Sequence, residues 1–238
     1  MSTSSGRVRR PYDDEMRRRA SVSPFAWSFA PYVVVSVTHV ILLATASPLA
    51  GPTKLLLMPL LAIPVAIAAS RFRPRSSMVL LLAALLFSWL GDSAGALFPT
   101  APELPLMLGF FGIAHLAYIA LFARHLAQRS FPWWALAYAA WWIGMLLALG
   151  PHTGGLLIAV AVYGLVLAGT AAFSARCHPL IATGGAFFLA SDTILAFRLF
   201  LPASLPAWSS PTIMLTYTLG QGLIVTGALF VLRKRGVA

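Results

Sequence analysis

The stretch MVLLLAALLFSWLGDSAGALF, residues 78–98, decides the fold. A helix needs about 20 predominantly apolar residues to cross the hydrocarbon core of a bilayer, and this stretch reaches that length with one charged residue, Asp92. The chain around it is 59% hydrophobic and 10% charged, whereas soluble domains are about a quarter charged. These features predict an all-α, polytopic membrane protein.

Similar stretches recur along the chain and predict a bundle of about eight transmembrane helices. Pro59 and Pro64 should bend the second helix, which a membrane tolerates when neighbouring groups satisfy the freed carbonyls. The predicted spans are Phe29–Leu49, Lys54–Ser70, Met78–Phe98, Pro105–Leu126, Trp133–Leu149, Gly154–Ser174, Leu180–Leu201 and Thr212–Leu232. Residues 28–238 are thus predicted to form the transmembrane domain.

Residues 1–27 are predicted to be a disordered, basic cytosolic tail. They have no apolar core before Phe25, so they do not resemble a cleaved signal peptide. Of the 17 Lys and Arg residues, all but Lys54 and Arg198 fall on one side of the predicted bundle. Cytosolic loops are enriched in Lys and Arg, so both termini are predicted to be cytosolic. The basic residues on that side are Arg7, Arg9, Arg10, Arg17, Arg18, Arg19, Arg71, Arg73, Arg75, Arg124, Arg129, Arg176, Arg233, Lys234 and Arg235.

The net charge of +11 does not predict nucleic-acid binding, because the arginines form short clusters between long apolar runs. The single cysteine, Cys177, has no partner for a disulfide or a metal motif. No metal and no cofactor are expected. The composition, rich in Arg, Ala and Leu and poor in Lys, is typical of a bacterial protein from a GC-rich genome, which predicts the bacterial cell (inner) membrane.

After the tail the chain contains only the acids Asp92, Glu103 and Asp192. Glu103 is expected in a loop between Pro102 and Pro105, on the non-cytosolic side. Asp92 and Asp192 are predicted to lie inside apolar helices, where an Asp costs at least about 2.5–3.5 kcal/mol on insertion scales. Two such residues suggest a shared polar cavity.

His115, Tyr163 and Gln221 are predicted at a similar depth to the two aspartates, roughly 9–15 Å below the non-cytosolic surface. Polar groups from several helices at one level favour a single pocket. Helical spacing adds Ser88, Tyr118 and Tyr217 to the same faces, although small and aromatic residues at such spacing also simply pack helices together. His39 has no partner that the sequence identifies.

Both aspartates follow similar segments, Phe87–Asp92 and Phe188–Asp192, and a polar residue occurs one helix later in each case. This pattern suggests a parallel four-plus-four duplication.

As an ordered set, these segments resemble the YhhN family, whose characterised animal members are lysoplasmalogenases. The resemblance extends from about Lys54 to Ile224. It departs at Leu55, where the family usually has proline, and at Gly220, where it usually has alanine. The matching residues are Lys54 with Met58-Pro59-Leu60, Leu86-Phe87-Ser88 with Gly91-Asp92, Gly109 leading to Ala114-His115 and Tyr118, Tyr163, Gly185-Ala186 with Phe188 and Ser191-Asp192, Arg198 with Phe200, and Tyr217 with Gln221.

The resemblance implies hydrolysis of the vinyl ether bond of a lysoplasmalogen to a fatty aldehyde and a glycerophospho-base such as glycerophosphoethanolamine or glycerophosphocholine. That chemistry needs a proton donor and a carboxylate, as in glycosidases. Asp92 and Asp192 fit as the pair, because burial and mutual repulsion would hold one proton on them; which is the acid stays open. His115 would shuttle protons or orient water.

The resemblance also implies a lysophospholipid or ether-lipid substrate, with membrane lipids as the other partners. Lys54 and Arg198 would hold the head-group phosphate near the mouth of the pocket. The remaining substrate-binding candidates are Ser88, Tyr118, Tyr163, Ser191, Tyr217 and Gln221. The sequence gives no indication of the oligomeric state.

Other functions fit the same residues less well. An intramembrane aspartyl protease usually has a Gly-x-Gly-Asp element, but Trp89 stands at the first glycine position. A zinc-dependent amidase would need several core histidines, and only His39 and His115 lie well inside predicted helices. A proton-coupled transporter of a small molecule or lipid stays an alternative, because buried Asp and His sets also form proton relays.

Overall fold

The computed structural model describes residues 25–69 and 74–236. Most of the predicted N-terminal tail, together with Arg71 and Arg73, lies outside these ranges. Within them the structure is helical and contains no strand. Among the described residues, eight helices are long and apolar enough to cross a membrane. The predicted fold class is therefore confirmed.

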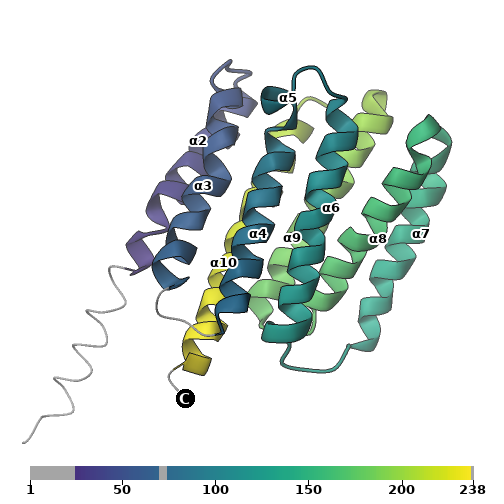
Figure 1. The fold of residues 1–238 in the computed structure, drawn as a ribbon. Helices are drawn as coiled ribbons and strands as arrows, with labels where there is room; N and C mark the ends of the chain where they lie inside the picture. Colours follow the sequence, from purple (N-terminus) through teal and green to yellow (C-terminus); the bar gives the residue numbers. More distant parts are fainter. Residues whose placement is uncertain (1–24, 70–73, 237–238) are drawn as a thin grey trace, which may run out of the picture.

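The long helices run side by side as a bundle (Figure 1). The short segments are α5 (Ala94–Leu97), the π-helical η1 (Phe122–Leu126) and the 3₁₀ segments η2 (Trp133–Ala135), η3 (Gly150–His152), η4 (Gly154–Leu156) and η5 (Pro202–Ser204). The long helices are α2 (Ala30–Ala44), α3 (Ala50–Ala69), α4 (Arg75–Asp92), α6 (Glu103–Leu121), α7 (Leu136–Leu149), α8 (Leu157–Ser174), α9 (Pro179–Phe200) and α10 (Ser209–Gly236).

Among the boundaries that differ from the prediction, two concern acidic residues. The helix expected over residues 78–98 ends at Asp92, and Ser93, whose hydroxyl donates to the Trp89 carbonyl, separates it from α5. Asp92 thus lies at a helix end rather than in a helix interior. Glu103 is the first residue of α6 rather than a loop residue, a position where the helix dipole favours an acid.

The prolines of α3 free a carbonyl that a neighbouring helix uses. Pro59 has no N–H, so the carbonyl of Leu55 loses its normal partner four residues on. The indole Nε1 of Trp89 donates to that carbonyl at 2.9 Å. This bond confirms that a neighbour satisfies the carbonyl that Pro59 frees, and it ties α3 to α4 beside Lys54 and Asp92.

Glycines allow α9 and α10 to touch at the backbone. A Cβ on Gly184 would lie 2.8 Å from the Gly220 carbonyl oxygen and 2.9 Å from the Ile224 nitrogen. A Cβ on Gly220 would in turn lie 2.9 Å from the Phe188 nitrogen. Small residues at membrane helix interfaces permit this close approach, and it fixes the rotation of both helices.

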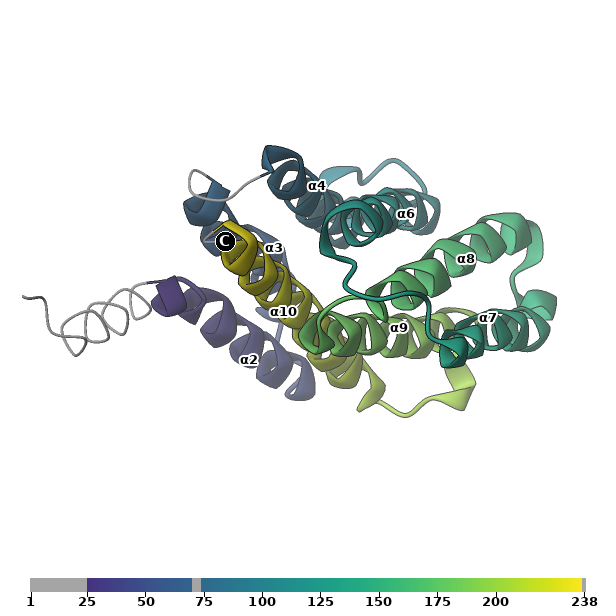
Figure 2. The same ribbon diagram turned by 90° about the horizontal axis from the view of Figure 1, so that it is seen from below.

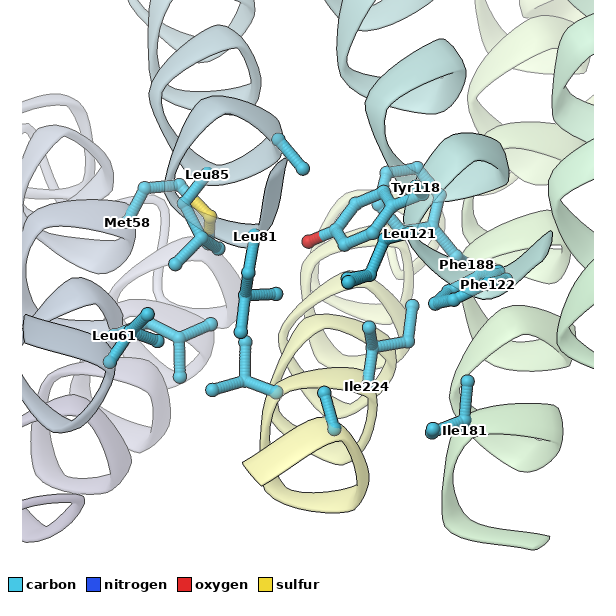
Figure 3. Packing of buried hydrophobic residues seen from close by; sticks show 14 of the residues in the cluster. Met58, Leu61, Leu81, Leu85, Tyr118, Leu121, Phe122, Ile181, Phe188 and Ile224 are labelled. Carbon is cyan, nitrogen blue, oxygen red and sulfur yellow. The ribbon is translucent and has the colours of Figure 1, made fainter. Parts of the chain in front are cut away.

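The core is centred on α10. In the apolar stretch that identifies α10 as a membrane span, 61% of the residues are buried. The corresponding share is 17% for the first span and 6% for the span that contains α7. Viewed from below, α2 and α7 lie at opposite edges of the bundle (Figure 2). Side chains of α3 and α4 such as Leu61 and Leu81 lie on one side of α10, and Tyr118 and Leu121 of α6 lie on the other (Figure 3).

The basic loops gather at one end of the bundle. Arg235 donates to the carbonyls of His125 and Ala127, and the Gln128 nitrogen donates to the Arg176 carbonyl at 2.8 Å. These bonds join the ends of α6, α8 and α10. Below, this end is called the basic face; its cytosolic orientation stays a prediction, as does the four-plus-four duplication.

The close contact between α9 and α10 predicts that Gly184→Ala destabilises the protein. Overpacking usually costs about 1–3 kcal/mol, and here the added methyl meets backbone atoms that cannot rotate away. Thermal unfolding of the purified protein should show a lower Tm. Gly109→Ala is the control, because a Cβ there meets nothing within 4 Å; equal Tm values for both variants would contradict this interpretation.

Candidate functional site

Asp92 is the centre of the first polar network, near the end of the bundle opposite the basic face. Its side chain is 4% exposed, and Oδ1 lies 3.2 Å from the Lys54 Nζ of α3. The Tyr217 hydroxyl of α10 donates to Oδ2 at 2.8 Å. A buried carboxylate is stable in its ionised form only when such partners surround it. The predicted residues Lys54, Asp92 and Tyr217 are thus brought together from three helices.

Gln221 extends this network one turn deeper along α10. Its amide Nε2 donates to the Ser88 hydroxyl at 3.1 Å and lies 3.5 Å from the Tyr217 hydroxyl. Its Oε1 accepts from the hydroxyl of Tyr118. Every hydrogen of the amide nitrogen therefore has an acceptor. Such a fully satisfied network holds Tyr217 rigidly against Asp92.

Asp192 belongs to a second network between α6, α8 and α9. The Tyr163 hydroxyl donates to its Oδ2, and the His115 Nε2 lies 3.8 Å from the same oxygen. The Tyr163 hydroxyl is also 3.4 Å from that ring nitrogen. The structure thus brings together the predicted residues Asp192, His115 and Tyr163 without a Lys or Arg ion pair to the carboxyl in the described ranges.

Thr170 holds the imidazole ring of His115, and the sequence analysis missed it. Its hydroxyl donates to the Val166 carbonyl at 2.9 Å, so its oxygen can accept from His115 Nδ1 at 3.1 Å. We therefore assign the Nδ1–H tautomer, which leaves the Nε2 lone pair facing Tyr163 and Asp192. A polar residue at a regular helical position among apolar neighbours is the only signal that the sequence offered.

Aromatic rings separate the two networks. Phe188 lies 4.8 Å from the His115 ring and 5.4 Å from the Tyr217 ring, measured between centroids. Phe111 packs against both Phe188 and Tyr217. No hydrogen bond joins Asp92 to Asp192 in the described ranges, so the two aspartates belong to separate networks, and the expected sharing of one proton between them stays a prediction. Phe111 precedes His115 by one helical turn, and Phe188 precedes Asp192 by the same distance; this spacing is visible in the sequence.

A small cavity of about 40 Å³ borders Asp192. Apart from Asp192 and Tyr163, its lining is almost entirely apolar and comes from α7, α8 and α9, with the indole rings of Trp141 and Trp142 among it. The carboxyl thus faces a space suited to a hydrocarbon group.

Several predicted site residues have other partners. The Ser191 hydroxyl donates to the Ile213 carbonyl at 3.0 Å and so joins α9 to α10. Arg198 donates to the Ser209 hydroxyl at 2.7 Å and so joins α9 to α10; its expected role at the phosphate stays a prediction. His39, which had no identified partner, lies with Nδ1 2.9 Å from the Thr53 hydroxyl.

Other nucleophiles and ligand sets are poorly placed. Burial raises the pKa of the Cys177 thiol to about 12, so it stays protonated and unreactive near neutral pH. No three His, Cys, Asp or Glu side chains gather into a metal-binding group among residues 25–69 and 74–236.

Comparison with known proteins agrees with the resemblance seen in the sequence. The model of the YhhN family matches residues 49–228, a range that contains both networks. No curated protein and no solved structure matches the chain.

The ion pair between Lys54 and Asp92 predicts a specific stability coupling. Lys54→Met leaves a buried carboxyl without its cation, and because the Lys54 side chain is 34% exposed we expect a loss of about 1–3 kcal/mol, below that of a fully buried pair. Lys54→Met combined with Asp92→Asn should recover much of this loss. Thermal unfolding of the wild type, both single variants and the double variant measures the coupling; strictly additive changes would argue against the pair.

Proposed function

The chain belongs to the YhhN family, and from this membership together with the site we propose that it is a membrane-embedded hydrolase of lysoplasmalogen-type lipids. It would cleave the vinyl ether bond to a fatty aldehyde and glycerophosphoethanolamine or glycerophosphocholine. The observation that carries the proposal is a carboxyl, Asp192, that faces an apolar cavity and has a phenol and an imidazole as its partners.

The reaction begins with transfer of a proton to the distal carbon of the alkene. The electron pair of the double bond forms the new C–H bond, and the ether oxygen stabilises the resulting oxocarbenium ion. Water adds to this cation and loses a proton, which gives a hemiacetal. Collapse of the hemiacetal breaks the carbon–oxygen bond, and the proton returns to the glycerol oxygen. Only water is consumed, so the proposal requires no cofactor.

In this proposal Asp192 donates the first proton and, as a carboxylate, accepts one from the attacking water. Carboxylic acids serve as proton donors in other enzymes. Tyr163 positions the carboxyl through its hydroxyl. His115, held by Thr170 at Nδ1, presents Nε2 to the same space and can accept the proton of the water or return it to Asp192.

Asp92 plays a different part, because Lys54 provides it with a counterion. The pair forms a fixed polar group near the non-basic end, and Tyr217, Gln221, Tyr118 and Ser88 hold it in place. In our proposal it orients the glycerol and phosphate part of the substrate, with Lys54 shared between Asp92 and the phosphate. Arg198 and Ser191 then act as positioning residues for the ends of α9 and α10.

The protein is then an integral membrane enzyme with its chemistry on the side away from the basic face. If that face is cytosolic, as the positive charges indicate, the site serves lipids of the opposite leaflet. We propose the bacterial cell membrane as its location.

Asp192→Asn tests the proposed acid. We expect vinyl ether cleavage to fall by about 10²–10⁴-fold, the usual contribution of a general acid or base. The measurement is mass spectrometry of aldehyde and glycerophospho product from purified protein in vesicles. Glu103→Gln is the control, because it removes a carboxylate outside both networks. Undiminished turnover in Asp192→Asn would refute the mechanism, and proton uptake into vesicles without product release would favour the transporter instead.

Thr170→Val tests whether the tautomer of His115 matters. The substitution keeps the shape but removes the acceptor of Nδ1–H, so we expect turnover to fall about 10–100-fold, as when the outer partner of a functional histidine is lost. The pH–rate profile should also change, and Thr170→Ser should restore both. An unaltered profile in Thr170→Val, with the Tm lowered, would mean that Thr170 only packs α8.

A further inference from the structure

A second, larger hollow lies next to the cavity at Asp192. This hollow, the α7–α8 groove, has a volume of about 610 Å³, within the roughly 300–1,000 Å³ typical of ligand sites. Its lining is almost entirely apolar and comes from η2, α7 and α8 together with the loop before them. Its helix α7 lies at the edge of the bundle (Figures 1 and 2).

Trp142 forms a wall of both hollows. Its indole ring borders the groove on one side and the cavity at Asp192 on the other. The ring packs against Gly164, whose added Cβ would lie 3.1 Å from its Cδ1, and its Nε1 donates to the Ala161 carbonyl at 2.9 Å. Trp142 thus lines both the open apolar groove and the cavity that contains Asp192.

The groove has a direction. From Trp142 and Ile143 it follows α7 toward Trp133, about 15 Å along the helix, and ends beside Phe131. There the Arg176 guanidinium lies 4.5 Å from the centroid of the Phe131 ring, and Phe173 packs against that ring edge to face. The end near Trp142 is therefore on the non-basic side, and the other end reaches the basic face.

We propose that the α7–α8 groove holds the hydrocarbon chain of a single-chain ether lipid and that Trp142 is the gate between this chain site and Asp192. A lipid whose ether lies at Asp192 and whose chain follows the groove has its head group at the non-basic end, where Lys54 and Arg198 lie. That is the orientation of a lipid in the leaflet opposite the basic face. This inference rests on the proposed function, because it places the chain of that substrate.

Weak burial of α7 makes the gate operable. Only 6% of the apolar stretch that identifies its span is buried. Two indole groups of α7 form hydrogen bonds to other helices: Trp142 Nε1 donates to α8, and Trp141 Nε1 donates to the Thr193 hydroxyl of α9 at 3.1 Å. The groove between α2 and α10, although similar in size, has no carboxyl in its lining.

Photolabelling of the full-length protein tests the chain site. The probe is a lysophosphocholine with a saturated hexadecyl ether and a diazirine near its terminal methyl group, in phosphatidylcholine vesicles; it has no vinyl ether to cleave. We expect labelled peptides from residues 131–145 and 165–172. Gly164→Val should reduce that labelling by about tenfold, the scale on which a filled apolar pocket discriminates. Gly144→Val, on the same helix pair with nothing within 4 Å of its added Cβ, should not.

A second pair of variants keeps the inference falsifiable if Gly164→Val does not fold. Ala139→Trp narrows the groove, whereas Ala140→Trp is a matched control, because both alanines are exposed but only Ala139 lines the groove. Labelling by the hexadecyl probe should fall about fivefold or more in Ala139→Trp alone, while an octyl probe should label both equally.

Labelling spread over other helices, or equal labelling in each matched pair, would overturn the chain site even if vinyl ether turnover were intact. Labelling of the groove by a protein that releases no aldehyde would support the chain site and overturn the proposed hydrolysis alone.

Discussion

A hydrogen-bonding group inside a hydrocarbon core cannot bond to water, so it must find its partner within the protein. The arrangement of this bundle follows from that constraint. The carbonyl that Pro59 leaves free meets the indole of Trp89. The amide of Gln221 finds an acceptor for each hydrogen and a donor for its oxygen. Each bond joins helices that apolar packing alone would leave free to rotate, so the polar residues determine which faces of the helices meet.

The sequence predicted the fold class and the number of spans, because length and hydropathy decide whether a segment crosses a membrane. It placed Asp92 in a helix interior, because an apolar run does not reveal that the helix ends beside Ser93, whose hydroxyl donates to the Trp89 carbonyl. Depth along the helices predicted that polar residues gather near one end. The depth of a residue along its helix does not say how the helix is rotated about its axis, however. The sequence therefore could not assign Asp92 and Asp192 to separate networks.

Rotation depends on contacts between helices far apart in the chain. Gly220 shows this most clearly, because a Cβ there would lie 2.9 Å from the Phe188 nitrogen. Close approach of α9 to α10 brings Phe188 between His115 and Tyr217. One ring therefore gives the two carboxyls different environments, one with an ammonium partner and one facing an apolar cavity. The role of Thr170 as the partner of His115 could not be predicted either, because it depends on the contact between α6 and α8.

Weak attachment of α7 makes this helix depend on the lipid around it. Most of its surface faces hydrocarbon, and the regular α-helix is 14 residues long, about 21 Å, shorter than the hydrophobic thickness of a typical bilayer. The 3₁₀ turns at both ends complete the span. A thicker or thinner membrane thus strains α7 before it strains the well-packed α10, because hydrophobic mismatch acts on the element with the fewest neighbours. Through this helix, membrane thickness and acyl-chain order act directly on the wall beside Asp192.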